Sequence, residues 1–337
     1  MLASRLRIGV LGAARIARAF VAGCRGSRLV DVVGVASRRP ETARAFAEDC
    51  GLARWFGSYE AMLADRDVDA VYLPLPTGLH AKWAIRAVEA GKHVLCEKPL
   101  TTSAAEARAM FAAARRHGVA LREAYPYLAQ QQTAQIRRWI GEGAIGRTGL
   151  IRVGFSALID DPSNVRYAPE LGGGAMYDLG SYGVSFLRVV VGSRPLRAQA
   201  TSIFHARGVD VTTLANLEFE GGLLAQVACS FSGGYQRSAA ICGDKGVIET
   251  SFPNHPPIGG SPVLRIRRGV GQTDVFEEAE VEPANGFLAE AESFARLIAQ
   301  GEAAWSGASE QESIDIAATI DAIRASARSG GWETVAP

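Results

Sequence analysis

The sequence predicts an α/β fold, with an N-terminal doubly wound parallel sheet and a C-terminal α+β domain holding a large open, mostly antiparallel sheet. Strand and helix patterns alternate over the first third of the chain, as a parallel sheet covered by helices on both faces requires. Short alternating strands separated by glycine-containing turns come later, and two helical patterns close the chain. We therefore expect one domain over residues 1–122 and a second over residues 123–337.

The N-terminal region is built from apolar runs that lead into amphipathic helices. The expected strands are 7–11, 29–36, 70–75, 93–96 and 119–123. The expected helices are 15–23, 40–50, 58–64, 79–90 and 103–117. Ser103 followed three residues later by Glu106 predicts a capping box at the start of the last of these helices. Repetition of such units predicts a parallel sheet.

The C-terminal region has a different pattern. Helices are expected at 132–141, 176–191, 287–300 and 310–328, and strands at 149–156, 214–220, 222–230 and 238–242. The segments 220–222 and 244–246 resemble turns between antiparallel strands. This mixture predicts α+β structure around one antiparallel sheet.

Composition narrows the class of protein. The formal net charge of the 337 residues is +1, and the charges are scattered, so we expect neither nucleic acid nor a membrane surface as a partner. The apolar runs are too short to span a bilayer, and residues 1–7 show no signal-peptide pattern, which predicts a cytoplasmic protein. The five cysteines are too widely spaced for a metal site or a disulfide framework, so no metal is expected.

A glycine stands where the first strand gives way to the first helix, in the sequence Gly12-Ala13-Ala14-Arg15-Ile16. In a Rossmann domain the first glycine of this turn allows a tight bend, and the pyrophosphate of a dinucleotide lies over the free N–H groups of the helix. Alanine at Ala14, the usual second glycine position, weakens the motif. Its place in the first βαβ unit still predicts a dinucleotide site formed by these five residues.

The end of the second strand predicts which dinucleotide is bound. NAD-binding domains usually carry an acidic residue here for the ribose 2′-hydroxyl, and an acidic residue would repel a 2′-phosphate. This chain has Ser37 and Arg38 instead. A hydroxyl and a planar guanidinium suit a phosphate. We expect NADP(H), with NAD(H) as the alternative.

Further motifs extend over most of the chain. They are Gly91-Lys92-His93-Val94-Leu95-Cys96-Glu97-Lys98-Pro99, the preceding Leu79-His80-Ala81-Lys82-Trp83, and Gly172-Gly173-Gly174 followed by Asp178 and Tyr182. Together with Gly12 they make the chain resemble the glucose–fructose oxidoreductase, inositol dehydrogenase and MocA family. Tyrosine at position 182, where inositol dehydrogenases have histidine, places the resemblance in the tyrosine-type subgroup.

The position of Lys98 indicates chemistry independently of the resemblance. Lys98 follows an apolar strand and so lies at the carboxyl edge of the predicted parallel sheet, where doubly wound folds bind ligands. An ammonium group beside an oxidised nicotinamide, in a partly dry cleft, loses its proton more easily and can help to deprotonate a hydroxyl. The resemblance implies that Lys98 is catalytic and that its bond to Pro99 is cis. Glu97 is expected to position the lysine or the cofactor.

Asp178 and Tyr182 are four residues apart and therefore neighbours on one helix face. A tyrosine has an ordinary pKa of about 10 and needs a nearby cation to exchange protons near neutrality; we expect Lys98 to be that cation. Tyr182 is the expected proton donor or acceptor, and Asp178 is expected to orient the substrate or the lysine.

Several further residues are assigned to the cofactor site. They lie at the end of the expected strand 70–75 or of the expected strand 119–123, or they are implied by the resemblance. These residues are Leu75, Pro76, Thr77, His80, Glu123 and Arg166. Thr77 departs from the family's usual amide. Leu128, Gln130 and Gln131 stand where the subgroup has an arginine and a His-Pro pair, which makes transfer of any one family member's substrate doubtful.

These observations predict an enzyme that moves a hydride between nicotinamide and a CH–OH or C=O group of a sugar or polyol. One alternative is a trans-dihydrodiol or dicarbonyl oxidoreductase with an apolar pocket to which Tyr125 and Tyr127 contribute. Another is a non-enzymatic NADP-binding regulator, which has no need to keep Lys98, Asp178 and Tyr182 together. The resemblance further implies a homodimer or homotetramer formed through the C-terminal sheet.

Overall fold

The computed structural model describes residues 5–252, 263–282 and 284–337. Residues 1–4, the first part of the N-terminal segment considered above, lie outside this range. The chain divides into two compact units. The first comprises 1–101, 105–129 and 285–310, and the second comprises 102–104, 130–284 and 311–337. Each is described by itself below.

The first unit contains a six-stranded parallel sheet in the order β3-β2-β1-β4-β5-β6. Its strands are β1 (Leu6–Leu11), β2 (Val30–Ala36), β3 (Arg54–Phe56), β4 (Ala70–Leu73), β5 (His93–Glu97) and β6 (Leu121–Ala124). This is the strand order of a Rossmann domain, so the predicted doubly wound sheet is confirmed. The sequence analysis did not predict β3.

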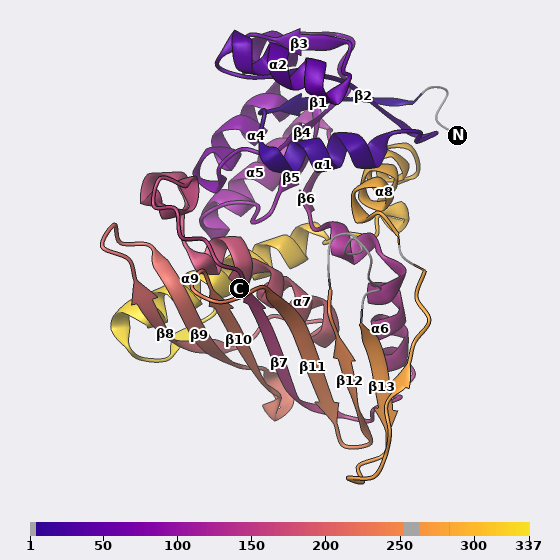
Figure 1. The fold of residues 1–337 in the computed structure, drawn as a ribbon, viewed down its shortest axis with the longest axis vertical. Coiled ribbons are helices and arrows are strands. Elements are labelled where there is room, and N and C mark those ends of the chain that lie inside the picture. The colour runs from indigo at the N-terminus through magenta and orange to yellow at the C-terminus, as the bar shows by residue number, and fades with distance from the viewer. Residues whose placement is uncertain (1–4, 253–262, 283) are drawn as a thin grey trace. The chain divides into compact units, whose positions relative to one another are not determined.

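Helices accompany this sheet. They are α1 (Arg15–Cys24), α2 (Pro40–Cys50), α3 (Tyr59–Leu63), α4 (His80–Glu89), α5 (Ala104–His117) and α8 (Gly286–Gln300), with short turns η1 (Thr77–Leu79), η2 (Pro126–Ala129) and η7 (Glu302–Ala304). Of these, α1, α2, α4, α5 and α8 can be followed in Figure 1. Helix α8 comes from the far end of the chain and packs beside α1. Gly23 allows this approach, because a Cβ atom there would lie 3.0 Å from the Asn285 side chain.

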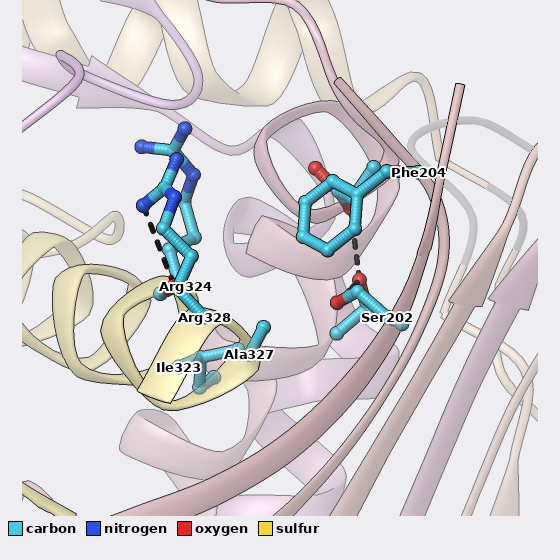
Figure 2. Close-up of a pocket in the computed structure, with 8 residues that line it drawn as sticks. Ser202, Phe204, Ile323, Arg324, Ala327 and Arg328 are labelled. Carbon is cyan, nitrogen blue, oxygen red and sulfur yellow. Dashed lines mark hydrogen bonds between the residues drawn. The ribbon is translucent and has the colours of Figure 1, made fainter. Parts of the chain in front are cut away.

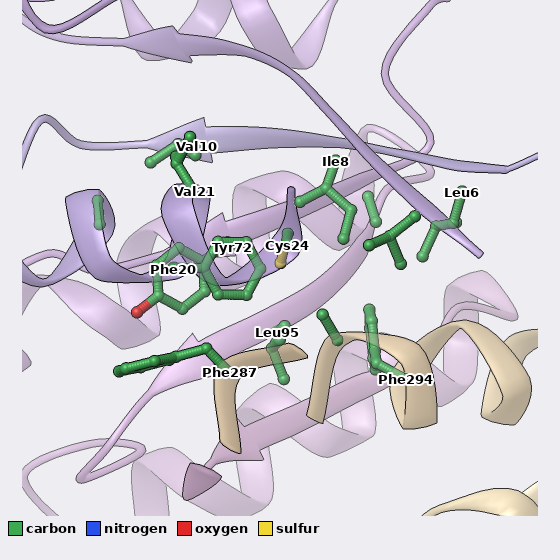
Figure 3. Close-up of a cluster of buried hydrophobic side chains, with 14 of the residues drawn as sticks. Leu6, Ile8, Val10, Phe20, Val21, Cys24, Tyr72, Leu95, Phe287 and Phe294 are labelled. Atoms are coloured by element: carbon green, nitrogen blue, oxygen red, sulfur yellow. The ribbon is translucent and has the colours of Figure 1, made fainter. Parts of the chain in front are cut away.

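The core of the first unit joins α1, the sheet and α8 (Figure 3). Phe20 of α1 stacks on Tyr72 of β4 with ring centroids 3.9 Å apart, and Phe287 and Phe294 of α8 belong to the same buried cluster. Each such ring contributes about 1.5–3 kcal/mol when it is fully removed from water. Helix α8 is therefore an integral part of this core.

The second unit holds a nine-stranded sheet in the order β14-β13-β12-β11-β7-β10-β9-β8-β15. Its strands are β7 (Thr148–Ser156), β8 (Arg197–Phe204), β9 (Asp210–Glu218), β10 (Leu224–Ser230), β11 (Gln236–Gly243), β12 (Gly246–Thr250), β13 (Leu264–Arg268), β14 (Glu277–Glu278) and β15 (Glu333–Thr334). Among the strand pairs that the structure describes in this sheet, only β7 and β10 run parallel to each other. The expected mostly antiparallel sheet is confirmed.

Helices cover one face of this sheet (Figure 1). They include α6 (Gln131–Gly141), a π-helical turn η5 (Met176–Gly180) that continues into α7 (Ser181–Val191), and α9 (Glu310–Ser329); the short turns are η3 (Val165–Tyr167), η4 (Pro169–Leu171) and η6 (Glu220–Gly222). Helix α7 lies close to the strands because Gly183 faces Val227, where a Cβ atom would come within 2.9 Å. The opposite face exposes the leucines Leu150, Leu214 and Leu224.

Two further expectations concern the whole chain. All five cysteines are free thiols, as the sequence analysis expected. Within the described residues, no helix is both long enough and apolar enough to cross a membrane.

Candidate functional site

Lys98 lies on a turn that is held by hydrogen bonds at every residue. The Lys98–Pro99 peptide bond is cis, as the family resemblance implied. The N–H of Lys98 donates to Glu97 Oε2 (3.2 Å), and the N–H of Leu100 donates to Glu123 Oε1 (2.8 Å). The Pro99 carbonyl oxygen lies 3.0 Å from His80 Nδ1. This turn directly follows β5, so Lys98 stands at the carboxyl edge of the parallel sheet.

Glu97 and His80 are therefore placed to support the lysine turn. The Tyr72 hydroxyl donates to Glu97 Oε1 at 2.5 Å, which leaves Glu97 bonded on both oxygens. The other ring nitrogen of His80 lies 2.6 Å from the Leu75 carbonyl oxygen, so the imidazole links the ends of β4 and β5. Burial lowers the pKa of His80, and the two carbonyl oxygens oppose that change. These contacts agree with a structural role for both residues.

The turn after β1 fits the diphosphate of a dinucleotide. Gly12 has φ +133°, a region that favours glycine, and a Cβ atom there would lie 2.7 Å from the Leu75 side chain. Helix α1 begins after Ala14, whose side chain caps none of the first N–H groups. Arg15 and Ile16 are exposed beside this helix start. The residues present thus leave backbone donors available for an anion.

Ser37 and Arg38 follow β2, as predicted. Ser37 is buried, and its hydroxyl oxygen accepts the N–H of Arg39 at 3.2 Å. Arg38 is exposed and lies by the Tyr59 phenol. Burial raises the pKa of Tyr59, and the Arg38 guanidinium opposes the rise. An exposed guanidinium at this strand end suits the 2′-phosphate of NADP.

Asp178, Tyr182 and Arg166 come together in the second unit. Asp178 lies in the π-helical turn and Tyr182 in the first turn of α7, and π-helical turns are frequent at functional sites. The Arg166 guanidinium bonds to the Asp178 carboxylate. Asp178, with a smaller contribution from Tyr182, raises the pKa of Arg166. Assignment of Arg166 to the cofactor stays a prediction, and so do the roles of the other two residues.

The glycine run before this helix is needed for packing of the chain against itself. A Cβ atom on Gly173 would lie 2.5 Å from the Arg166 carbonyl oxygen, and one on Gly174 would lie 2.3 Å from Asp210 Oδ1. Asp210 also accepts the N–H of Met176 at 2.7 Å. Because these positions are glycines, the backbone at Arg166 and the side chain of Asp210 can pack directly against the segment that leads into the helix.

The sequence analysis missed Arg237, which lies over the ring of Tyr182. Its guanidinium carbon is 4.0 Å from the centroid of that ring. Arg237 is on β11, where burial alternates so that Arg237, Ala239 and Ile241 are the buried residues. The signal was thus an arginine in the inward positions of an otherwise apolar strand pattern.

A small pocket in the second unit lies apart from these residues (Figure 2). Ser202 and Phe204 of β8 line it together with Arg324 and Arg328 of α9. It contains none of the predicted site residues. Asp210 lines this pocket and also accepts the N–H of Met176, which begins the helical turn that carries Asp178.

A Rossmann sheet with a lysine clamped at its carboxyl edge, joined in one chain to an open antiparallel sheet, defines an oxidoreductase of the nicotinamide-binding class. Two family models match the chain. The oxidoreductase family model with an NAD-binding Rossmann fold covers residues 6–125, and the model of the Gfo/Idh/MocA C-terminal domain covers residues 133–249. The chain belongs to the Gfo/Idh/MocA oxidoreductase family.

Curated relatives span nearly the same length. A dTDP-3,4-didehydro-2,6-dideoxy-alpha-D-glucose 3-reductase from Streptomyces violaceoruber is 36% identical over 96% of this chain and 95% of its own. A D-xylose 1-dehydrogenase (NADP(+)) from Haloferax volcanii is 34% identical over 96% and 98%. A trans-1,2-dihydrobenzene-1,2-diol dehydrogenase from Xenopus laevis is 35% identical over 72% and 74%. All three are dehydrogenases or reductases.

A 3-ketoreductase from Actinomadura kijaniata, solved with NADP and TDP-benzene, has a similar structure, with a TM-score of 0.86 and 33% identity over 96% of this chain and 98% of that one. Its solved variants replace one lysine by alanine or glutamate and one tyrosine by phenylalanine. Those two positions are separated by the same number of residues as Lys98 and Tyr182. The expected nicotinamide cofactor is thus confirmed for the family, with NADP in this relative.

Proposed function

We propose that this protein is an NADP(H)-dependent oxidoreductase that transfers a hydride between nicotinamide and a CH–OH or C=O group of a sugar or polyol-like substrate. The main observation in support is the position of Lys98, on a turn that hydrogen bonds to Glu97 and Glu123 fix at the carboxyl edge of the Rossmann sheet. Ligands of doubly wound sheets bind along that edge. The relatives that act on sugars and a sugar nucleotide support the substrate class.

The two units supply different groups in this proposal. When bound, NADPH supplies the hydride for reduction and NADP⁺ accepts it in oxidation. Lys98 binds the substrate oxygen through its ammonium group. Tyr182 gives a proton to that oxygen in reduction and takes the hydroxyl proton in oxidation, and Asp178 orients the substrate. The matching separation of the substituted lysine and tyrosine in the ketoreductase supports this assignment.

Cofactor binding is assigned to the first unit. The Gly12–Ile16 turn would hold the diphosphate, with Ser37 and Arg38 at the ribose 2′-phosphate. The segment after β4, from Leu75 to Thr77, would lie along the nicotinamide side. The exposed guanidinium of Arg38 and the helix start without a side-chain cap support these assignments.

The test is a panel of aldoses, polyols, keto sugars and dihydrodiols, each assayed with NADP(H) and NAD(H). On the best substrate we expect Lys98→Met and Tyr182→Phe each to lower kcat by about 10²-fold or more. Lys82→Met serves as the control, because Lys82 is an exposed lysine of α4. Smaller losses than this in either test variant would contradict acid–base duty for that residue.

A dihydrodiol or dicarbonyl substrate is the second candidate, favoured by the similarity to the Xenopus dehydrogenase. Tyr125 and Tyr127 are buried and meet edge to face with ring centroids 6.0 Å apart. The same panel separates the two candidates, since only this one predicts faster turnover of trans-dihydrodiols than of every sugar tested.

We also propose self-association through the open face of the nine-stranded sheet. Leu150, Leu214 and Leu224 are exposed on adjacent strands of this face, and Ile203 extends the row on β8. Leu150 and Leu224 are direct cross-strand neighbours, and groups of exposed apolar side chains on one face mark interaction surfaces. Leu214→Asp is expected to convert a dimer or tetramer into monomers in sedimentation velocity, and a wild-type monomer would contradict the proposal.

A further inference from the structure

Arg237 is a buried cation on the covered face of the second sheet. Its exposed fraction is 8%, and its cross-strand partner on β7 is Phe155. The guanidinium carbon lies 4.0 Å from the ring centroid of Tyr182, 4.6 Å from that of Phe252 and 5.0 Å from that of Phe155. Taking a guanidinium out of water costs free energy, and aromatic faces offset part of that cost. The nearest of the three rings is the candidate acid–base residue.

The charges around Tyr182 distinguish Arg237 from the other arginine there. Arg166, in η3, is also close enough to interact with Tyr182, but it bonds to the Asp178 carboxylate of η5. Asp178 therefore offsets much of the charge of Arg166 at this ring. Arg237, on β11, lies over the rings of Tyr182, Phe252 and Phe155. Arg166 and Arg237 thus both lie near Tyr182 within the second unit, and they differ in their described partners.

The contacts of Tyr182 also fix its ring. Tyr182 is 6% exposed, and Phe155 lies against it with centroids 5.5 Å apart and planes tilted by 59°. Arg237 covers another part of the ring, and Phe252, which stacks on Phe186 of α7 at 4.9 Å, lies on the guanidinium in turn. A planar guanidinium suits this stacking in a way that a lysine ammonium does not.

We propose that Arg237 is a positioning residue for Tyr182: its guanidinium, stacked over the phenol ring, holds that ring in the place from which it exchanges the proton. The inference rests on the proposed function, in which Tyr182 moves the proton. A ring without this support would present its hydroxyl to the substrate oxygen less often, so the rate of proton transfer depends on the contact.

The experiment measures kcat and KM for oxidation of the best alcohol substrate over a range of pH, in the full-length protein. We expect Arg237→Met to lower kcat near neutrality about tenfold or more, with KM changed less than about twofold. The deficit should persist at every pH tested, because Arg237→Met leaves the ring without its planar support whatever the pH. Arg237→Lys should recover part of the loss, since it restores charge without the planar stack.

Arg197→Met is the matched control. Arg197 also lies over an aromatic ring in the same sheet, 4.6 Å from the Trp332 centroid, but on the exposed strand β8. It should keep the wild-type kcat and pH profile. If Arg237→Met does not fold, Arg237→Gln also removes the guanidinium over the ring, and the same results are expected of it.

The outcomes separate this inference from the proposed function. A wild-type kcat in Arg237→Met, or a change confined to KM, would overturn the inference while a slow Tyr182→Phe keeps the proposed function. Full turnover by Tyr182→Phe would overturn both. A loss of kcat at every pH that Arg237→Lys partly restores supports the inference.

Discussion

Glu290 is a glutamate inside the first unit whose replacement by glutamine should stabilise the protein at neutral pH. It lies on α8 with 1% of its surface exposed, and neither carboxyl oxygen has a hydrogen bond of normal geometry to the described residues. Burial is the main cause that raises its pKa well above the ordinary 4.5, and the nearby carboxyl groups of Glu97 and Glu123 raise it further. The N–H of Tyr125 opposes the rise.

The sign of the effect follows from proton binding. The folded chain holds the Glu290 proton to a higher pH than the unfolded chain does, so unfolding releases a proton above about pH 4.5. Stability from this group is therefore lost as the pH rises from there towards the folded pKa, by about 1.4 kcal/mol per pH unit. The folded pKa sets how far this loss continues, and about 1.4 kcal/mol per pH unit is its upper limit. Glu290→Gln, which carries no titrating proton, removes this part of the pH dependence.

The assay is urea unfolding at several pH values from about 5 to 7, followed by tryptophan fluorescence. The free-energy difference between Glu290→Gln and wild type should grow in favour of the variant as the pH rises, by up to about 1.4 kcal/mol per pH unit. Glu48→Gln is the control, since Glu48 is a carboxylate on the exposed side of α2 with 64% of its side chain in solvent. Parallel pH dependence of wild type and Glu290→Gln would refute the reasoning.

Two further changes test the cofactor assignment and the second unit. Arg38→Ala should lower the ratio of kcat/KM with NADP to that with NAD by about tenfold or more, because a charge-assisted contact to the 2′-phosphate is lost; an unchanged ratio from steady-state kinetics contradicts the assignment. Arg188→Met should cost about 3 kcal/mol in urea unfolding, because the buried Asp315 carboxylate, 2.8 Å from Arg188 Nε, loses its partner. The double variant Arg188→Met/Asp315→Leu should regain much of this loss, and equal stability of all three proteins would contradict a buried ion pair.

Most of the elements could be predicted from the sequence because their patterns are local. The helix over Pro40–Cys50 begins with proline and ends before glycine, and both signals act within a few residues. Strand β3 escaped prediction because it has only three residues and none of them is buried. The cis bond before Pro99 was implied by family resemblance and by nothing in the local pattern.

Residues of the candidate site could be predicted only where a reactive side chain directly follows a recognisable strand or begins a recognisable helix. Lys98, Arg38 and Tyr182 stand at such positions. Arg237 lies one residue before the expected strand 238–242 and joins β11 only in the structure, and its burial depends on rings from other parts of the chain. Glu290 escaped for the same reason, since the carboxyl groups near it lie far away in sequence.

The origin of α8 has a consequence for how the chain is synthesised. All six strands of the first sheet have been synthesised once residue 124 is made, but Phe287 and Phe294, which complete the core around Phe20 and Tyr72, are added more than 160 residues later. A nascent chain ending before residue 286 presents this apolar surface to water and to other chains. The first unit is thus completed by a segment that is made long after its last strand.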